Sequence, residues 1–387
     1  MFNSQSSVVN PVILMRLRII RLRWVCVLIA VALLAGCASH PSVRVEPWPQ
    51  FDALFARNDG WTGADGAYSV ELSDGLILWL FGDTWIGKIR DDRHEDSVLV
   101  NNSIALQTGT DPADARVEFF WGITEEGKPA AFFRPADGKG WLWPYQGYLA
   151  SNGLYLFLVQ LEPDSNPASL GFKVAATWLA HVGNPRDPPA RWHITQKRIP
   201  FGSYSGSGDT LFGSATLKDG AFVYVYGVRD VVQDGFRNKH MLVARVAEDR
   251  LGDFHQWRFY ADGQWKESFS QAGGLCGQMA NEFSVSFLAD RNSYAVVYAP
   301  GGFGQKIAAR TSPTPYGPWS QPLELYRCPE ASWAANIFCY AAKAHPHLSD
   351  KPDELIVTYV ANSVDFDRVA NDARLYRPRF LRVVFEP

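Results

Sequence analysis

Residues 63–85 read GADGAYSVELSDGLILWLFGDTW, an alternating apolar pattern broken once by the turn sequence SDG. Two such runs around a turn of Ser, Asp and Gly are a strong signal for a β-hairpin. Two further aspartates, Asp65 and Asp83, stand at the outer ends of this hairpin. If Leu72 faces Leu76 across the turn, Asp65 also faces Asp83, and like charges in this position destabilise a sheet. Either the pair serves a function, or each aspartate caps the backbone of its own turn.

The same strand–turn–strand pattern occurs five times in the chain. The second runs begin at residues 76, 154, 221, 294 and 355, so the unit repeats every 61 to 78 residues. In the last unit, residues 346–348 are expected to pair with the run that starts at residue 355. Repeats of this length, each with about four strands, are typical of propeller blades. We therefore expect an all-β fold, a five-bladed β-propeller with four-stranded antiparallel blades, rather than a β-sandwich or jelly roll.

The first 36 residues have the pattern of a secretory signal peptide. Arginines precede an apolar run that ends in Leu-Ala-Gly-Cys at residues 34–37, which resembles a bacterial lipobox. In a lipobox, the cysteine, here Cys37, is lipid-modified and becomes the first mature residue. A transmembrane anchor is the alternative, but the apolar run is short for a membrane span. Because Ala38 follows the cysteine, we expect a lipid-anchored location at the outer membrane of the bacterial envelope, on its periplasmic or surface face.

We therefore expect three parts: a signal peptide over residues 1–36, a lipidated tether over 37–50 and a propeller over 51–387. Export implies an oxidising compartment, in which Cys328 and Cys339 are close enough in sequence to form a disulfide and leave Cys276 free. The formal net charge of −3 gives no reason to expect nucleic acid as a partner. The sequence indicates no cofactor and no metal ligands. A structural cation on the propeller axis is compatible with it, although no ligand cluster points to one.

Counting back from each second run finds the positions that correspond to Asp65. At or beside these positions stand Trp143, Asp209, Glu282, Lys343 and His345. Because the innermost strands of a propeller converge on its axis, we expect these side chains to surround one funnel. Asp209 and Glu282 stand one residue off the matching position, and adjacent strand residues face opposite ways unless a bulge intervenes. Paired carboxylates in such a funnel are what glycoside hydrolysis requires, one as proton donor and one as base or nucleophile.

The chain resembles the five-bladed propeller family known as domain of unknown function 4185, some of whose members are endo-D-arabinanases. The resemblance covers about residues 50–385 and rests on GADGAYSVELSDG, LWLFGDTWIG, VNNSIALQ, NEFSVSF and APGGFGQKIAARTSPTPYGPWS. It implies an exported enzyme that cuts a furanoside polymer with two carboxylates. Asp65 and Asp83 match the paired aspartates of the motif, and Glu282 matches an acidic residue that opens the fourth blade. Asn102 belongs to the most specific part, and Asn101 stands where the motif has a histidine.

Several other residues are candidates for substrate binding, each with a structural alternative. Trp85, Trp143 and Tyr340 are candidate stacking platforms for a sugar, although propeller aromatics are more often part of the core. Arg93 follows the FGDTW sequence and either contacts a sugar hydroxyl or belongs to a solvated loop. Arg229 ends the second strand of the third unit and either faces the funnel or forms a structural ion pair. Lys343 and His345 are the basic groups of the ring, and packing is the alternative for His345.

Two functions of different classes follow from this sequence. The first is a lipid-anchored glycoside hydrolase that acts on an arabinofuranose-type glycan such as D-arabinan, with Asp65 and Asp83 as acid and base and with help from Glu282. The carboxyl groups of directly opposed strand residues lie closer together than the two carboxyl groups of either an inverting or a retaining glycosidase. In a second assignment, Asp65 therefore works with Glu282, and Asp83 only shifts the pKa of its neighbour. The other function is a non-catalytic lipoprotein that binds glycan or scaffolds partners. The expected partners are a polysaccharide or oligosaccharide and, through Cys37, the membrane.

Overall fold

The computed structural model describes residues 42–386, apart from residues 167–168, 206–207 and 234–235. The expected signal peptide and the expected lipidation site, Cys37, therefore lie outside the described residues. Within the described part of the chain, no helix is long enough and apolar enough to cross a membrane. The described fold is all-β, as the sequence predicts.

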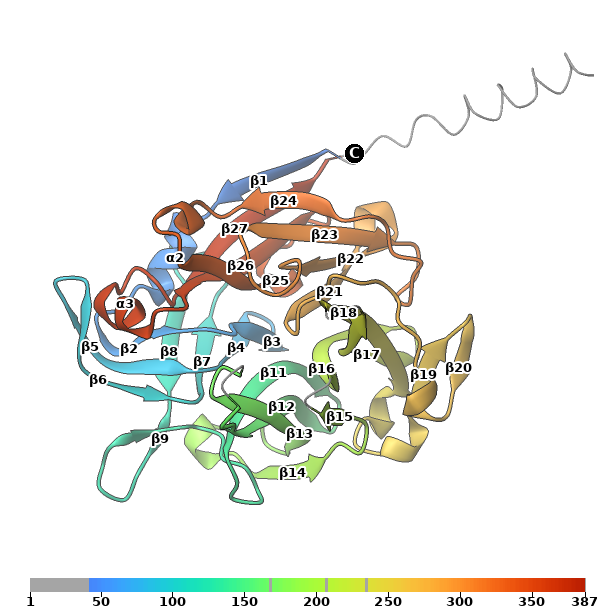
Figure 1. Ribbon diagram of the computed structural model, residues 1–387, viewed down its shortest axis with the longest axis horizontal. Helices are drawn as coiled ribbons and strands as arrows, with labels where there is room; N and C mark the ends of the chain where they lie inside the picture. Colours follow the sequence, from blue (N-terminus) through green and yellow to red (C-terminus); the bar gives the residue numbers. More distant parts are fainter. Residues whose placement is uncertain (1–41, 167–168, 206–207, 234–235, 387) are drawn as a thin grey trace, which may run out of the picture. The chain divides into compact units, whose positions relative to one another are not determined.

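Five sheets of the described residues contain four or more strands (Figure 1). In strand order, the first sheet contains β3 (Tyr68–Ser73), β4 (Leu76–Phe81), β7 (Ser103–Thr108) and β8 (Arg116–Phe120), and the second contains β11 (Trp141–Ala150), β12 (Gly153–Pro163), β13 (Phe172–Val182) and β14 (Ile194–Arg198). The third contains β15 (Ser203–Ser205), β16 (Gly208–Asp219), β17 (Phe222–Gln233), β18 (Phe236–Ala247), β19 (Arg258–Ala261) and β20 (Gln264–Lys266). The fourth contains β21 (Phe283–Leu288), β22 (Ser293–Tyr298), β23 (Lys306–Ser312) and β24 (Leu323–Arg327), and the fifth contains β1 (Val43–Pro47), β27 (Pro378–Phe385), β26 (Glu354–Ser363) and β25 (Ile337–His345).

Smaller elements complete the described structure. One sheet contains β2 (Asp59–Ala64), β5 (Thr84–Arg90) and β6 (Arg93–Val100), and another contains β10 (Pro129–Ala130) and β9 (Gly122–Ile123). The helices are α2 (Pro49–Phe55) and α3 (Phe366–Asn371), with short 3-10 turns at Pro189–Arg191, Glu248–Arg250, Phe254–Gln256, Phe269–Gln271, Ala289–Arg291, Pro329–Ser332 and Pro346–Leu348. The sheets of the described residues thus have two to six strands, and blades of four strands each stay a prediction.

One strand of each large sheet, which we call its inner strand, contacts the inner strand of the next sheet. These contacts join β3 to β11, β11 to β16, β16 to β21, β21 to β25, and β25 back to β3. The five inner strands therefore surround a common centre, and Figure 1 shows the sheets following one another around it. This arrangement brings together side chains from segments that are far apart in the sequence.

The predicted hairpins form in four of the five units, as β3–β4, β11–β12, β16–β17 and β21–β22. In the fifth unit, the prediction for residues 346–348 is wrong. These residues form a 3-10 turn, and the inner strand β25 ends before them, at His345. Pro346 explains the difference, because proline has no backbone N–H to continue the ladder.

The first described strand, β1, closes the sheet formed by the C-terminal strands. It pairs with β27 from Val43 opposite Phe385 to Pro47 opposite Leu381. The expected tether over residues 37–50 is therefore too long, since residues 43–47 of it form a paired strand and α2 begins at Pro49. β1 has only five residues, two of them charged, and this is too short a pattern for a strand to be predicted with its partner so far away.

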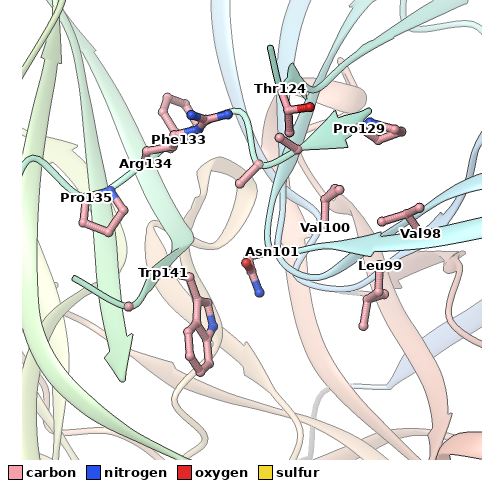
Figure 2. A pocket seen from close by; sticks show the side chains of 13 residues that line it. Val98, Leu99, Val100, Asn101, Thr124, Pro129, Phe133, Arg134, Pro135 and Trp141 are labelled. Carbon is pink, nitrogen blue, oxygen red and sulfur yellow. The ribbon is translucent and has the colours of Figure 1, made fainter. Parts of the chain in front are cut away.

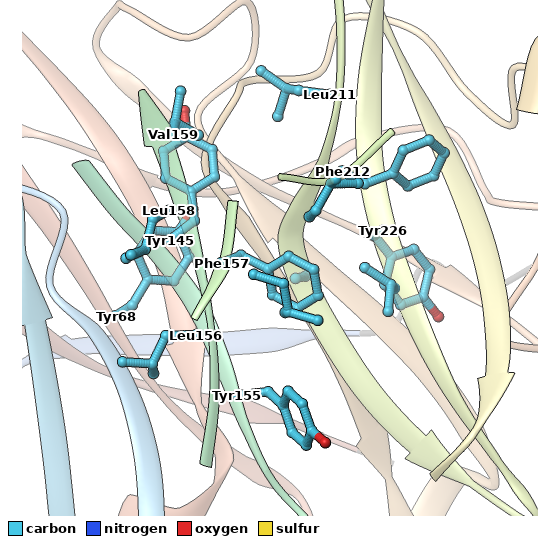
Figure 3. Close-up of a cluster of buried hydrophobic side chains, with 14 of the residues drawn as sticks. Tyr68, Tyr145, Tyr155, Leu156, Phe157, Leu158, Val159, Leu211, Phe212 and Tyr226 are labelled. Carbon is cyan, nitrogen blue, oxygen red and sulfur yellow. The ribbon is translucent and has the colours of Figure 1, made fainter. Parts of the chain in front are cut away.

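The core is built from strands that are covered on both faces. In β12, nine consecutive residues from Gly153 to Leu161 are buried, a pattern typical of strands with sheets on each side. Figure 3 shows part of the largest cluster, in which Tyr68, Phe157 and Phe212 come from three different inner or second strands. Each large buried side chain contributes about 1.5–3 kcal/mol to stability, so this core gives the inner strands a rigid frame.

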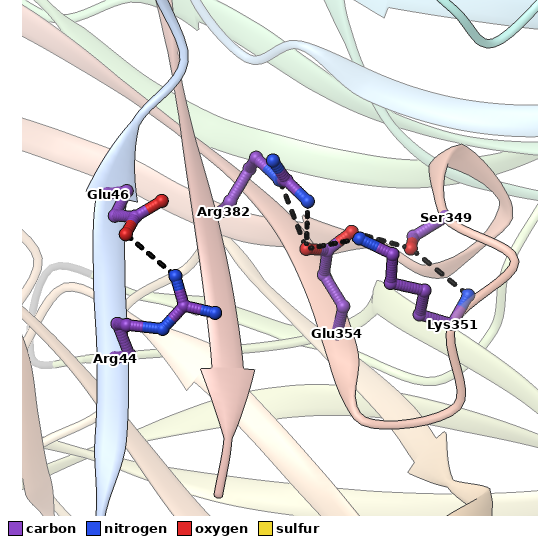
Figure 4. Close-up of polar contacts among 6 residues, drawn as sticks. All are labelled: Arg44, Glu46, Ser349, Lys351, Glu354 and Arg382. Atoms are coloured by element: carbon purple, nitrogen blue, oxygen red, sulfur yellow. Dashed lines mark hydrogen bonds and ion pairs between the residues drawn. The ribbon is translucent and has the colours of Figure 1, made fainter.

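A buried ion pair joins β26 and β27. Glu354 Oε2 accepts hydrogen bonds from Arg382 Nε at 3.0 Å and Nη2 at 2.7 Å, and Glu354 Oε1 accepts one from Ser349 Oγ at 2.8 Å (Figure 4). Lys351 Nζ lies 3.7 Å from the same carboxylate. These contacts satisfy a carboxylate that is almost inaccessible to water.

The three described cysteines are free thiols. The thiols of Cys328 and Cys339 are nevertheless neighbours, since a hydrogen bond to Cys339, together with burial, raises the pKa of Cys328. Cys276 lies apart from them and is half-buried.

Candidate active site

Asp65 and Asp83 lie in the two short links that connect the first hairpin to its neighbours. Asp65 lies between β2 and β3, and Asp83 lies between β4 and β5. The Asp65 amide donates a hydrogen bond to the Asp83 carbonyl at 3.4 Å, and the Gly82 amide donates one to the Asp65 carbonyl at 3.1 Å. The two aspartates are therefore held beside each other by the backbone.

The register of this hairpin agrees with the prediction over most of its length. Tyr68 faces Leu80, which is the pairing expected if the two aspartates face each other. At the turn, however, a bulge places Ser73 rather than Leu72 opposite Leu76. The bulge lies at the end of the hairpin farthest from the aspartates and leaves their pairing unchanged.

Gly82 makes the close approach of the two links feasible. A Cβ atom at this position would lie 2.3 Å from Asp65 Oδ1, which is far inside van der Waals contact. Any other residue at this position would force the Asp65 side chain to move. The glycine of the FGDTW sequence is therefore required by the position of the Asp65 carboxyl group.

The Asp65 carboxyl group lies in a half-buried environment with negative neighbours. Burial raises its pKa, and the charges of Asp83 and Glu282 raise it further, to about 8. Hydrogen bonds from Tyr340 and Tyr376 act in the opposite direction. The Tyr340 hydroxyl donates to Asp65 Oδ2 at 2.6 Å. The result is a carboxyl group that keeps its proton at neutral pH.

The Asp83 carboxyl group has donors around it. Trp143 Nε1 donates to Asp83 Oδ1 at 2.9 Å, and Asn101 Nδ2 donates to the same atom at 3.4 Å. Burial raises the pKa of Asp83, these two donors lower it, and the resulting pKa is about 6. In the described residues, neither aspartate side chain accepts a hydrogen bond from an amide of its own turn, so the turn-capping alternative finds no support.

Lys343 and Glu282 form a buried ion pair close to Asp65. Lys343 Nζ donates to Glu282 Oε1 at 3.1 Å and to the Ala341 carbonyl at 2.7 Å, and it also contacts the Gly66 carbonyl. Only 1% of the Lys343 side chain is exposed. Burial lowers its pKa, whereas the charges of Glu282 and Asp65 raise it. The ammonium group is thus a fixed positive charge among the carboxylates.

A bulge in β25 allows two of its residues to face this site. The ladder with β26 shifts between Tyr340 and Lys343, and Ala341 inside the shift has a φ of 58°. In a regular strand these two side chains would point to opposite faces. The bulge instead lets Tyr340 contact Asp65 while Lys343 contacts Glu282.

Asp209 and Arg229 lie near one another on β16 and β17. Asp209 is half-buried, and its pKa is raised by burial and by Asp230, whose Oδ2 accepts from the Asp209 amide at 3.2 Å. Burial raises the pKa of Tyr145, and the charges of Glu282, Asp65 and Asp209 raise it further, which indicates that these three carboxylates lie around it. Arg229 Nη1 donates to the Ala272 carbonyl at 2.8 Å.

Two predicted substrate-binding residues are used inside the fold. Asn102 is fully buried, and its side chain bonds to the backbone of Phe133 and Leu142. His345 is also buried, with Nδ1 bonded to Ser69 Oγ at 2.5 Å and Nε2 bonded to Thr358 Oγ1 at 2.8 Å. Neither side chain has a free polar group for a ligand.

Two others differ in their place relative to the site: Trp85 belongs to the same buried apolar cluster as Tyr340 and Tyr376, whereas Arg93 lies at a hairpin tip. Trp85 is buried between the rings of His94 and Phe366, with ring centroids 4.6 and 5.6 Å away. Arg93 is exposed at the tip of the β5–β6 hairpin, where it faces Arg90. In the described residues, no hydrogen bond or ion pair links either of them to the carboxylates.

A cavity of about 430 Å³ opens beside Asn101 (Figure 2). Its lining comes from the end of β6 at residues 98–101, from residues 124, 129–131 and 133–135, and from residues 140–141. Asn101, which donates to Asp83, is part of this lining. The described residues contain no group of three or more His, Cys, Asp or Glu side chains that could hold a metal ion.

Several residues at this site were not predicted from the sequence as functional. Tyr376 comes from the link before β27 and has no motif of its own. Trp141 and Asn101 line the cavity, and the Asn101 side chain also donates a hydrogen bond to Asp83. Phe303 is 60% exposed, and its ring lies 5.8 Å from that of Tyr340. The glycines around Phe303 in the PGGFGQ sequence were a usable signal for an exposed loop.

Comparison with known proteins relates the fold to solved structures. No curated protein sequence matches the chain. A structure described as a "putative hydrolase" from Bacteroides ovatus ATCC 8483 is similar, with a TM-score of 0.69, 22% identity, and 90% of this chain and 92% of that chain covered. At this identity the likeness shows a shared fold.

Two further structures are less similar. One is a thermostable family-43 glycoside hydrolase, with a TM-score of 0.44, 14% identity, and 85% of this chain and 91% of that chain covered. The other is an endo-arabinase from Bacteroides thetaiotaomicron VPI-5482, with a TM-score of 0.43, 12% identity, and 84% and 96% covered.

A family model corrects the resemblance inferred from the sequence. The expected membership of domain of unknown function 4185 is wrong, because the matching model is a different one, described as domain of unknown function DUF5005. The quoted segments encode a hairpin, a paired-aspartate turn and a GPW loop, which are features of fold and site that do not distinguish one family from another. The match spans residues 49–385, so the chain belongs to the DUF5005 family.

Proposed function

We propose that this protein is a glycoside hydrolase. The observation that carries the proposal is the pair of neighbouring carboxyl groups of Asp65 and Asp83, whose surroundings give them pKa values of about 8 and about 6. Two carboxyl groups with pKa values pushed apart provide an acid and a base at the same pH. Glycoside hydrolysis needs this combination.

In this proposal Asp65 is the proton donor. Its raised pKa keeps it protonated near neutral pH, and it transfers the proton to the glycosidic oxygen as the bond to the anomeric carbon breaks. Asp83 is ionised above a pH of about 6 and either deprotonates the attacking water or attacks the anomeric carbon itself. In both cases its negative charge stabilises the oxocarbenium-like transition state.

Glu282 and Lys343 support this pair. The negative charge of Glu282 raises the pKa of Asp65 and so helps it to retain its proton. The ion pair with the buried Lys343 holds Glu282 in position. In the second assignment, Asp65 works with Glu282, and Asp83 only shifts the pKa of Asp65. This assignment predicts a larger loss of activity in Glu282→Gln than in Asp83→Asn.

The test is hydrolysis of a panel of D- and L-arabinans, fructans, mannans, xylans and galactans, measured as new reducing ends. We expect the wild type to act on at least one glycan, and Asp65→Asn and Asp83→Asn each to lose activity by about 100-fold or more. Asp74→Asn, at the exposed turn of the same hairpin, is the matched control and should keep full activity.

Two outcomes would change the proposal. Near-normal activity of Asp83→Asn, together with a large loss in Glu282→Gln, would replace Asp83 by Glu282 as the partner of Asp65. No hydrolysis by the folded wild type, combined with retention on one glycan, would overturn the enzyme and leave a glycan-binding protein. The arabinofuranose-type substrate stays a prediction that the same panel tests.

We also propose that the five large sheets are the blades of a five-bladed propeller. The closed chain of contacts from β3 through β11, β16, β21 and β25 supports this proposal. An experimental structure in which a sixth sheet enters this ring, or in which the ring is open, would contradict it.

For localisation, we propose lipid anchoring at the outer membrane through Cys37. The support is the Leu-Ala-Gly-Cys sequence at the end of an apolar run. Metabolic labelling with a radioactive fatty acid should mark the wild type and not Cys37→Ser. Equal labelling of both, or of neither, would exclude this anchor.

A further inference from the structure

The cavity beside Asn101 is linked to the proposed reacting groups by one side chain. Asn101 lines it and donates to Asp83. Trp141, also in the lining, stands two positions before Trp143 on β11, so both indoles project from the same face of the strand. Because Asn101 lines the cavity and donates to Asp83 at 3.4 Å, a ligand in contact with Asn101 is one side chain away from Asp83.

One hydrogen-bond donor of the cavity lining has no acceptor. The indole nitrogen of Trp141 is buried and has no hydrogen-bond partner in the described residues. A buried donor in this state is unfavourable, and an oxygen atom of a ligand would satisfy it. Figure 2 shows Trp141 and Arg134 on one side of the cavity and Val98 and Pro129 on the other.

The charge of the lining is positive. Arg134 is exposed to solvent and forms no ion pair with a described residue, and no aspartate or glutamate lines the cavity. The neighbouring site, by contrast, contains the carboxyl groups of Asp65, Asp83 and Glu282. A guanidinium group placed apart from these carboxyl groups offers paired N–H donors that suit a planar anion.

We propose that this cavity binds a sugar residue that carries a negatively charged group, with Arg134 pairing with that group and Trp141 donating a hydrogen bond to the same residue. This inference rests on the proposed function and names its substrate class, an acidic glycan. The charge is either the carboxylate of a uronic acid or a sulfate ester, and both present oxygen acceptors to a guanidinium group.

The test measures binding of sugars that differ only in charge. Methyl glycosides of galactose, glucose and mannose, their uronic-acid counterparts and their 6-sulfates are titrated into Asp65→Asn protein, which binds without cleavage, and followed by ligand-observed NMR. We expect at least one acidic sugar to bind about tenfold more tightly than its neutral counterpart, with the preference decreasing as salt is added. The better acidic ligand distinguishes a uronate from a sulfate ester.

Arg134→Ala should abolish the preference and leave binding of the neutral sugar unchanged. Arg186→Ala, which removes an exposed arginine outside the cavity, is the control and should keep the preference. Equal binding of acidic and neutral sugars, no binding of any acidic sugar, or a preference that survives Arg134→Ala would overturn the inference.

The two proposals can fail separately. If the protein prefers acidic sugars through Arg134 but hydrolyses no glycan, the proposed binding site stands and the proposed hydrolase activity is contradicted. If the protein hydrolyses neutral glycans and does not prefer acidic sugars, the proposed hydrolase activity stands and the proposed acidic-sugar site in the cavity is contradicted.

Discussion

Asp65 and Asp83 are neighbours, but their surroundings favour different protonation states. The Asp65 carboxyl group has two other carboxylates nearby, and their charges add to the effect of burial on its pKa. The Asp83 carboxyl group accepts hydrogen bonds from Trp143 and Asn101, which stabilise its charged form. Such unequal pairs separate the roles of acid and base.

The rate of hydrolysis should therefore have a bell-shaped dependence on pH. Activity should fall below a pH of about 6, where Asp83 becomes protonated, and above a pH of about 8, where Asp65 loses its proton. The measurement is kcat/KM from pH 4 to 10 on the best substrate of the panel. A profile without an alkaline limb would contradict the role of Asp65 as acid, and Trp143→Phe should move the acidic limb to higher pH because it removes a donor to Asp83.

Asp65 should also lower the stability of the fold. Its pKa is about 8 in the folded state and 3.8 in the unfolded reference, so the folded state binds the proton more tightly. Stability due to this group is then fully present below a pH of 3.8 and decreases as the pH rises towards 8. Asp65→Asn, which does not titrate, should therefore raise the melting temperature more at pH 8 than at pH 4. Equal shifts at both pH values would show that the folded pKa is not raised.

Gly82→Ala should reduce activity through Asp65. The added Cβ would lie 2.3 Å from Asp65 Oδ1 and would displace the carboxyl group from its contact with Tyr340. We expect kcat to fall by about tenfold or more, since a misplacement of about 1 Å can cost 100-fold. Gly183→Ala is the control, because no atom lies within 4 Å of a Cβ at that position. Unchanged kcat in Gly82→Ala would separate Asp65 from catalysis.

The sequence predicted some of these residues and could not predict others. The register of one hairpin was enough to place Asp65 beside Asp83, because pairing within a hairpin is local. Tyr376 reaches Asp65 from the link before β27, and no local pattern contains that information. Asn102 and His345 were expected in the site, but both are used inside the fold: the Asn102 side chain bonds to the backbone of Phe133 and Leu142, and the His345 ring bonds to Ser69 and Thr358. These partners are distant in the sequence, so no local pattern indicates them.

At the scale of elements, the strands were easier to predict than their irregularities. Alternating patterns and turn sequences identified four of the hairpins. The bulge that turns both Tyr340 and Lys343 towards the carboxylates could not be predicted, because Ala341 adopts its positive φ only in the folded context. The short strand β1 was missed for a related reason, since its pairing is with the other end of the chain.

The ion pair between β26 and β27 should contribute to stability in a pH-dependent way. Burial by itself would raise the pKa of Glu354, but Ser349 and Arg382 lower it below its ordinary value of 4.5. The stabilisation is therefore present above pH 4.5 and is lost as the pH falls through the lower folded pKa. We expect Glu354→Gln to lower the free energy of unfolding by about 1–3 kcal/mol at pH 7.

This difference should shrink when urea unfolding is repeated at pH 3. Glu324→Gln is the control, since Glu324 pairs with Lys306 at 2.6 Å on an exposed surface and should change stability little. Equal effects of the two substitutions at pH 7 would contradict a special role for the buried pair.

At the scale of the whole molecule, the repeated strand–turn–strand pattern predicted the all-β class, but not the sizes of the sheets or the family, and the count of five blades stays a prediction. The third large sheet has six strands because the short strands β15 and β20 flank the four strands β16 to β19, and the repeat pattern does not predict such additions. Family membership depends on many weak similarities along residues 49–385, not on the few motifs that describe the site.

Removal of β1 should destabilise the closing sheet. A chain that begins at Trp48 would lack the partner of β27 and expose an unpaired strand edge, which is a site for association between molecules. We expect a lower melting temperature than in a chain that begins at Ser42, and self-association in sedimentation velocity. A monomeric protein of unchanged melting temperature would show that β1 is dispensable.

The pairing of β1 with β27 also has a consequence for biosynthesis. The ribosome makes β1 before any other described strand and makes β27 last, so this sheet must wait for translation of the entire chain. The other four large sheets are each formed from a contiguous segment and can fold while synthesis continues. A nonsense codon ahead of residue 378 would therefore leave the earlier sheets with their strands but deprive the nascent N-terminal strand of its only sheet partner among the described residues.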